Sequence, residues 1–376
     1  MTQPAAQRRR RLLRRWRAAG AAGVGASLAI VVMALVAALS GGDPPGHDSP
    51  SPTEVPMPRR IAYVPYWDQD RAFEVVRQNL DLLDEVSPVW YSLDSRGHVV
   101  LADAENTTVD RSTVQALREH GIRVIPTVTN LRDGEWDPLV VRTVLHDPTA
   151  MTTHVNALVE LAVTEGYDGI DIDYEDLRAA DRSAFSRFVA ELGAALRAEG
   201  KLLTVAVHPK TSDAGYDERN LAQDYRAIGA AADQVRVMTY DYSWESSPAG
   251  PQAPARWVEQ VIAWTVSQVP PDKVILGVVV LGYDWTDGGG VTVDYEQARS
   301  TAQAHGATIR RSDDGTPWYR YRDPSGNRHE VWYEDAKSAG EKLELVSRYG
   351  LGGAFVWRLG GEDPDVWRAI RAAPWS

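Results

Sequence analysis

The stretch DGIDIDYE, Asp168 to Glu175, places four acidic residues within eight positions that otherwise have the pattern of a buried strand. Side chains along a strand alternate between its two faces, so Asp171, Asp173 and Glu175 point one way and the residues between them the other. Asp168 has the opposite parity, which predicts a structural role at the entry to the strand.

Three stacked carboxylates are costly, because burying unpaired charge is unfavourable and like charges repel. A single buried aspartate commonly bridges backbone groups or an arginine, but a row of three is better explained by a role in catalysis. Crowding among carboxylates raises a pKa, so that one group can keep its proton near neutral pH and act as a general acid. The stretch therefore predicts a catalytic site.

Eight short apolar runs alternate with amphipathic helical segments after Arg59. The runs are RIAYVPYW, VSPVWYSL, GIRVIPTVTN, YDGIDIDYE, KLLTVAVHP, QVRVMTYDY, KVILGVVVLGY and LGGAFVWRL. This alternation predicts an α/β fold, the (β/α)8 or TIM barrel, with the three acids inside it and the isoleucines against the helices. A doubly wound open sheet is the alternative, but the glycine-rich turn usual after its first strand is missing.

The segment between the seventh and eighth runs is too long for one helix. It contains a helical stretch, DYEQARSTAQAHG, and a hairpin pattern, PWYRYRDPSGNRHEVWY, with aromatic runs on both sides of a turn. We therefore expect a small α+β insertion over about residues 285–334, on the face of the barrel where the βα loops build active sites.

The N-terminal region has a different composition. Residues 1–17 hold seven arginines in QRRRRLLRRWR, residues 18–39 carry no charge, and residues 40–58 are rich in Pro, Ser and Gly. Twenty-two apolar residues can span roughly 30 Å of hydrocarbon. The pattern predicts a basic cytoplasmic tail, a transmembrane signal anchor and a linker, with a barrel over residues 59–376 outside the cell membrane. A cleaved signal peptide, and hence secretion, is the alternative.

Composition excludes several classes of site. The absence of cysteine rules out disulfides, thiolate catalysis and cysteine-bound zinc, and the eight histidines form no HExxH motif. Neither a metal nor a cofactor is expected. The net charge of −12 becomes −19 without the seven arginines of the tail, which argues against nucleic acid as a partner. We expect a monomer.

Three motifs resemble one enzyme family. DGIDIDYE fits the DxxDxDxE signature of glycoside hydrolase family 18, the chitinase family, while MTYDYSW (238–244) and VWRLGGEDP (356–364) resemble its sixth-strand and eighth-strand motifs. The similarity extends over about residues 59–376 and is greatest to a bacterial branch that includes spore-cortex and cell-wall N-acetylglucosaminidases.

The resemblance implies a role for each matched residue. Glu175 is the acid that protonates the glycosidic oxygen, and Asp173 orients the acetamido group of the substrate and shares a proton with Asp171. Tyr240 bonds the acetamido carbonyl. The same sugar subsite is completed by Asp241, Met238 and, as its floor, Trp357.

Further aromatic residues at presumed strand ends are candidates for stacking on sugars, with core packing as the alternative for each. They are Tyr66, Trp67, Trp90, Tyr242, Trp244 and Trp285. Leu281 departs from many family members, which often carry an aromatic residue there, so one wall of the sugar pocket is expected to differ.

The family uses the substrate itself as nucleophile: the 2-acetamido oxygen attacks the anomeric carbon, and water opens the oxazolinium intermediate with retention. The resemblance thus predicts a membrane-tethered glycosidase cleaving β-1,4 bonds after N-acetylglucosamine in peptidoglycan or chitin. The alternative is a lectin-like barrel without catalysis. The presence of Glu175, Asp173 and Tyr240 favours the enzyme.

Overall fold

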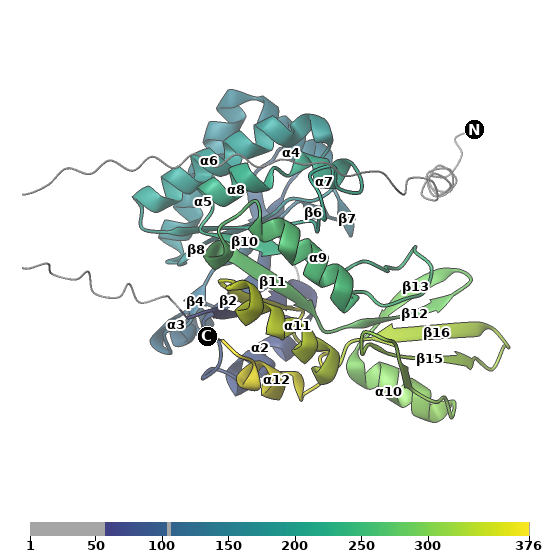
Figure 1. Ribbon diagram of the computed structural model, residues 1–376. Coiled ribbons are helices and arrows are strands. Elements are labelled where there is room, and N and C mark those ends of the chain that lie inside the picture. Colours follow the sequence, from purple (N-terminus) through teal and green to yellow (C-terminus); the bar gives the residue numbers. More distant parts are fainter. Residues whose placement is uncertain (1–56, 104–106, 376) are drawn as a thin grey trace, which may run out of the picture. The chain divides into compact units, whose positions relative to one another are not determined.

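Eight parallel strand positions close into a barrel in the computed structural model, which describes residues 57–103 and 107–375 (Figure 1). In chain order they are β1 (Arg59–Pro65), β2 (Glu85–Leu93), the interrupted strand β4 (Arg123–Val124) and β5 (Thr127–Thr129), β8 (Gly169–Asp173), β9 (Leu202–Val207), β10 (Gln234–Val237), β11 (Val274–Val279) and β17 (Gly353–Trp357). Strand β1 pairs with both β2 and β17, which closes the ring. The predicted (β/α)8 barrel is confirmed.

Helices cover the outside of the barrel and bury their apolar faces against it (Figure 1). They are α2 (Gln69–Gln78), α3 (Arg111–Glu119), α4 (Pro138–His146), α5 (Pro148–Thr164), α6 (Arg182–Ala198), α7 (Glu218–Ala222), α8 (Tyr225–Ala231), α9 (Ala255–Val266), α11 (Ala336–Tyr349) and α12 (Val366–Ala372). The sequence marks several of their starts. Asp137 and Asp147 each accept backbone N–H groups ahead of a helix whose first residue is proline, a residue that needs no N–H partner there.

Shorter elements connect the strands and helices on the barrel. They are the strand β3 (Val99–Leu101), which pairs antiparallel with β2, the hairpin β6 (Leu131–Arg132) and β7 (Glu135–Trp136), and the 3-10 turns η2 (Tyr66–Asp68), η3 (Ala179–Asp181) and η4 (Pro271–Lys273).

The acidic stretch has the alternation that the sequence predicts. Ile170 and Ile172 are fully buried in the main core. Tyr174 stacks on Phe188 of α6, with ring centroids 5.8 Å apart, and its hydroxyl lies 2.7 Å from Nε2 of His154 on α5. The apolar side of the stretch therefore faces the helices, which leaves the carboxylates for the barrel interior.

The insertion between the seventh and eighth barrel strands is an α+β unit, as predicted, and runs from 282 to 333. Its sheet is antiparallel, in the order β13 (Gly289–Val293), β12 (Gly282–Thr286), β16 (Arg328–Tyr333), β15 (Pro317–Arg322) and β14 (Arg310–Arg311). Helix α10 (Tyr295–Ala304) covers one face of it (Figure 1) and buries Ala298 and Ala302 against Tyr319, Val331 and Tyr333. The other face carries a cross-strand row of larger aromatic residues.

The predicted tail, membrane span and nearly all of the linker lie outside the described residues. Within residues 57–103 and 107–375, no helix combines the length and apolar character that crossing a membrane requires.

Candidate active site

The innermost carboxylate of the acidic stretch, Asp171, lies completely buried inside the barrel. One of its oxygens accepts hydrogen bonds from the Tyr63 hydroxyl (2.8 Å) and the Thr127 hydroxyl (2.9 Å), and the other accepts one from Thr204 (2.5 Å). These donors come from β1, β5 and β9, so the closed barrel assembles them. Asp171 is thereby held in one orientation beneath the next acid.

A fully buried arginine, Arg236 on β10, lies below this cluster, with Nη1 3.6 Å from a carboxylate oxygen of Asp171. Its donors reach four buried oxygens, those of Glu85 (3.0 Å), Ser87 (2.5 Å), Tyr63 (3.1 Å) and Gln234 (3.1 Å). Because a guanidinium only donates, the Tyr63 oxygen accepts from Arg236 and its own proton goes to Asp171. Arg236 was not among the residues predicted for the site, although it has the parity of Met238 and Tyr240 in the same run.

The next acid, Asp173, has the opposite character. Its Oδ1 is buried and has no hydrogen-bond partner among the described residues. Burial raises the pKa of Asp173 to about 7, and the nearby Asp171 carboxylate adds to the shift. Asp173 can therefore take up or release a proton near neutral pH.

The outermost acid, Glu175, lies at the opening of the barrel with 15% of its side chain exposed. Burial, then the charges of Asp173 and Asp241, raise its pKa well above the ordinary value. Asn130 fixes the backbone of Glu175 through two hydrogen bonds of 2.8 and 3.0 Å. A carboxyl group whose pKa is raised and whose backbone is held this firmly is suited to general-acid catalysis.

Two basic residues beside Glu175 were not predicted. Nε2 of His208 lies 3.7 Å from the Glu175 carboxylate, and burial lowers the pKa of His208 to about 3, so the imidazole is neutral. Arg219 bonds Asp217 at 2.8 Å and lies 3.7 Å from Asp176. Its positive charge opposes the rise in the pKa of Glu175. His208 directly follows the fifth strand, a position that the sequence could have flagged.

The residues of the sixth-strand motif gather next to the acids. Met238 and Tyr240 are buried, and burial, followed by the charges of Asp241 and Asp173, raises the pKa of Tyr240 well above its ordinary value. Asp241 has a left-handed backbone (φ 60°). Burial raises the pKa of Asp241 to about 6 against the opposing charge of Arg219.

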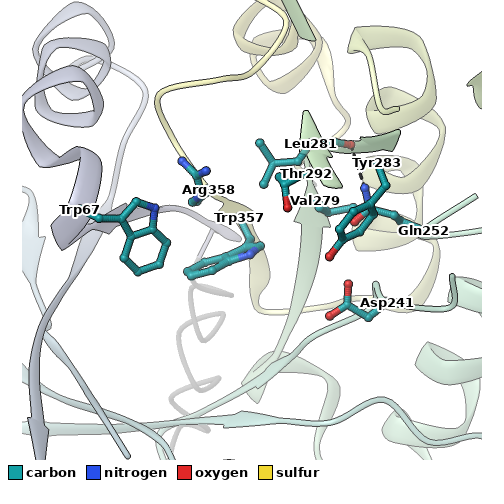
Figure 2. Close-up of a pocket in the computed structure, with 9 residues that line it drawn as sticks. All are labelled: Trp67, Asp241, Gln252, Val279, Leu281, Tyr283, Thr292, Trp357 and Arg358. Atoms are coloured by element: carbon teal, nitrogen blue, oxygen red, sulfur yellow. Dashed lines mark hydrogen bonds between the residues drawn. The ribbon is translucent and has the colours of Figure 1, made fainter. Parts of the chain in front are cut away.

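A cavity of about 290 Å³ opens beside Asp241 (Figure 2). Its other lining residues are Trp67, Gln252, Val279, Leu281, Tyr283, Thr292, Trp357 and Arg358. Gln252 is held by a 3.1 Å hydrogen bond to the Leu281 carbonyl. The volume is near the lower end of the range of about 300–1,000 Å³ for small-molecule sites.

The predicted aromatic residues divide between this cavity and other surroundings. Trp67, which is 47% exposed, and Trp357 line the cavity with ring centroids 6.5 Å apart, and Tyr66 packs edge-on against Trp67. Tyr242 is exposed and packs on Trp257.

For Trp285 the structure favours packing, the alternative left open by the sequence, because this residue is only 4% exposed and donates its N–H to the Trp244 carbonyl. Tyr283, two residues earlier on the same face of β12, takes the place at the cavity. Trp90 is fully buried in the core. Leu281 forms part of the cavity wall, at the position where many family members carry an aromatic residue.

The model of glycosyl hydrolases family 18 matches residues 59–363. The chain belongs to this family. Among its relatives, YdhD of Bacillus subtilis is 36% identical over 277 residues, covering 70% of this chain and 64% of YdhD. The cortical fragment-lytic enzyme of Bacillus subtilis is 34% identical over 247 residues, covering 64% of this chain and 57% of that enzyme. The match thus spans less than two thirds of the length of each of these relatives.

Solved structures share the family 18 barrel. The chitinase from Chromobacterium violaceum superposes with a TM-score of 0.77 at 28% identity, covering 84% of this chain and 98% of that one. The spore cortex-lytic enzyme SleL of Bacillus cereus gives 0.75 at 25% identity, with 84% and 73% covered. The residues that the structure describes contain no group of acidic and histidine side chains arranged to hold a metal ion.

Proposed function

We propose that the protein is a retaining glycosidase that cleaves β-1,4 bonds after N-acetylglucosamine with the help of the substrate's own acetamido group. The observation that carries this proposal is the pair of largely buried carboxyl groups with raised pKa values, Asp173 and Glu175, above a third, Asp171, whose two oxygens both accept hydrogen bonds. Family membership and the names of its cortex-lytic and chitinase relatives support the same reaction class.

In the first step, Glu175 gives its proton to the glycosidic oxygen as the bond from that oxygen to the anomeric carbon breaks. The acetamido oxygen of the same sugar forms the new bond to that carbon, and the ring that results carries a positive charge. Asp173 accepts the acetamido N–H and balances this charge, and its proton can be shared with Asp171. The Tyr240 hydroxyl bonds the acetamido oxygen and holds it for attack.

In the second step, water attacks the anomeric carbon from the face that the leaving group occupied. The Glu175 carboxylate takes a proton from that water, and the bond to the acetamido oxygen breaks. The configuration is retained because the carbon has been inverted twice. Trp357, which lines the cavity, stacks on the sugar.

A polymeric substrate fits the surface next to the cavity. On β12, β16 and β15 of the insertion, Tyr283, Trp332 and Trp318 occupy neighbouring positions of one cross-strand row. Tyr283 lines the cavity, and the rings of Trp332 and Trp318 stack with centroids 5.3 Å apart. The row continues the aromatic lining of the cavity for further sugars of a glycan. The substrate is peptidoglycan or chitin.

We also propose that the barrel lies outside the cell, tethered to the membrane by residues 18–39. Its support is the uncharged segment that follows the seven arginines in the sequence. Fractionating cells that express the full chain, next to a chain that begins at Arg59, tests this. The second chain lacks residues 18–39 and marks the cytosolic fraction, and recovery of the full chain in the medium would contradict tethering and support a cleaved signal peptide.

The main alternative is a lectin-like barrel that binds glycan without cleaving it. A chromogenic N-acetylglucosamine oligomer distinguishes the two when it is incubated with the wild type, Glu175→Gln and, as control, Glu191→Gln at an exposed position of α6. We expect the wild type and the control to release the chromophore and Glu175→Gln to lose about 100- to 10,000-fold in rate. Absence of release from all three supports the lectin. Resistance of the wild type to a mimic of the oxazoline would contradict substrate assistance.

A further inference from the structure

One wall of the cavity is cationic. Arg358 directly follows Trp357 at the end of β17 and lines the cavity, with 19% of its side chain exposed. In Figure 2 it lies between Trp67 and Leu281, above the Trp357 indole. Its guanidinium carbon is 5.5 Å from the centroid of a Trp67 ring. A positive charge thus faces the space that the proposed function assigns to sugar.

The hydrogen-bonding capacity of this guanidinium is unused. Among residues 57–103 and 107–375 no side chain or backbone group forms a hydrogen bond with it, and the carboxylate in its one ion pair there, that of Asp68, is 3.8 Å away. Burial lowers the pKa of Arg358, and the charge of Asp68 only partly opposes this. An arginine presents five N–H donors in a planar fork that matches a carboxylate.

The other acids near Arg358 have partners of their own. Asp294 accepts hydrogen bonds from Arg71 (3.3 Å) and from a backbone N–H at the start of α10. Glu362 accepts two backbone N–H groups and the Trp367 indole N–H. Neither is in place to take up the donors of Arg358, so an anion in the cavity would not have to displace an existing bond.

We infer that Arg358 binds a carboxylate of the glycan and so selects peptidoglycan over neutral chitin. The inference rests on the proposed function, in which a sugar occupies this cavity. Peptidoglycan alternates N-acetylglucosamine with N-acetylmuramic acid, whose lactyl ether ends in a carboxyl group. That group is a free carboxylate where no peptide is attached and an amide where one is, and in the second case only the peptide supplies carboxylates.

Three substrates separate these sources: glycan strands freed of peptide by an amidase, the same strands with their lactyl carboxyl groups reduced to alcohols, and strands that keep their peptides. For each we compare kcat/KM of the wild type with Arg358→Gln, Arg358→Lys and the control Arg77→Gln, which removes the same charge from an exposed position of α2 that pairs, among the described residues, only with Glu74. The readout is selectivity, the ratio of kcat/KM for peptide-free strands to that for reduced strands.

We expect Arg358→Gln to lower this ratio about 10- to 100-fold, as for loss of hydrogen bonds to a charged group. Arg358→Lys should keep part of the ratio, and Arg77→Gln should keep all of it. If Arg358→Gln lowers kcat/KM only on peptide-bearing strands, the peptide is the source of the carboxylate. The inference is overturned if kcat/KM of the wild type is the same on all three substrates, or if Arg358→Gln keeps the full preference of the wild type for carboxylate-bearing strands, whether the carboxylate is lactyl or peptide.

Binding gives a second readout that does not require turnover. In the Glu175→Gln background, calorimetric titration with the same strands should show tighter binding of carboxylate-bearing strands, and this preference should disappear in the double variant with Arg358→Gln. Failure of the wild type to cleave any strand refutes the proposed function, whereas the loss or persistence of this binding preference decides the role of Arg358.

Discussion

Replacing Asp173 with asparagine should make the protein more stable at pH 8 while lowering its activity. The native structure buries this carboxyl group next to Asp171 and leaves its Oδ1 without a hydrogen bond. The native state therefore favours the protonated form, with a pKa raised from 3.8 to about 7. At pH 8 the wild type must carry an uncompensated buried charge, and asparagine carries none.

The size of the effect follows from linkage. The raised pKa contributes stability in full below the unfolded-state value near 3.8, and this contribution is lost as pH rises through about 7. A difference of about three pKa units corresponds to about 4 kcal/mol. The free energy of unfolding of Asp173→Asn should thus exceed that of the wild type by up to about 4 kcal/mol at pH 8, and the two should converge near pH 4.

Urea unfolding followed by tryptophan fluorescence between pH 4 and 8.5 measures this difference. Asp335→Asn is a control of opposite sign. Burial raises the pKa of Asp335, but hydrogen bonds from Arg311 and from the Ser338 backbone N–H outweigh this effect and lower it below the ordinary value. The stability that Asp335 contributes is present above its ordinary pKa and is lost as pH falls, so its replacement should destabilise the protein most at high pH. An Asp173→Asn variant that is less stable than the wild type at pH 8 would refute the reasoning.

Three further outcomes are expected. In Asp173→Asn the alkaline limb of the kcat/KM profile, on which activity falls with rising pH, should move to lower pH, because the charge of Asp173 no longer raises the pKa of Glu175. A limb that does not move would mean that a group other than Glu175 titrates there. Tyr63→Phe removes hydrogen bonds with two charged groups, Asp171 and Arg236, and should lower the free energy of unfolding in urea by about 3 kcal/mol. Tyr91→Phe removes a hydrogen bond with a neutral hydroxyl, that of Tyr167, and should cost about 1 kcal/mol, so equal losses would count against the charged network. Trp332→Ala should raise KM for long oligomers more than for a disaccharide, and an equal effect on both would remove the aromatic row from the glycan path.

The sequence by itself determines the local structure of this protein, that is, which segments form strands and helices and which face each side chain is on. Alternation in DGIDIDYE assigns each side chain to one face of a strand, because the period of a strand is two whatever surrounds it. Ile172 and Asp173 therefore have opposite surroundings in any fold that buries this strand. The repeated strand and helix patterns likewise predict the barrel, and the long aromatic segment predicts its insertion.

Contacts between distant segments depended on the closed barrel. Arg236 meets Tyr63 across 173 positions of sequence, and Glu85 across 151. No local pattern specifies such pairs, since they arise from the way β1, β2 and β10 place side chains in one interior. For the same reason Trp285, a candidate for stacking on sugar, is buried with its N–H on the Trp244 carbonyl outside the insertion. Arg358 belongs to the eighth-strand motif, but only the folded cavity brings its guanidinium to the space beside Trp357 and Asp241.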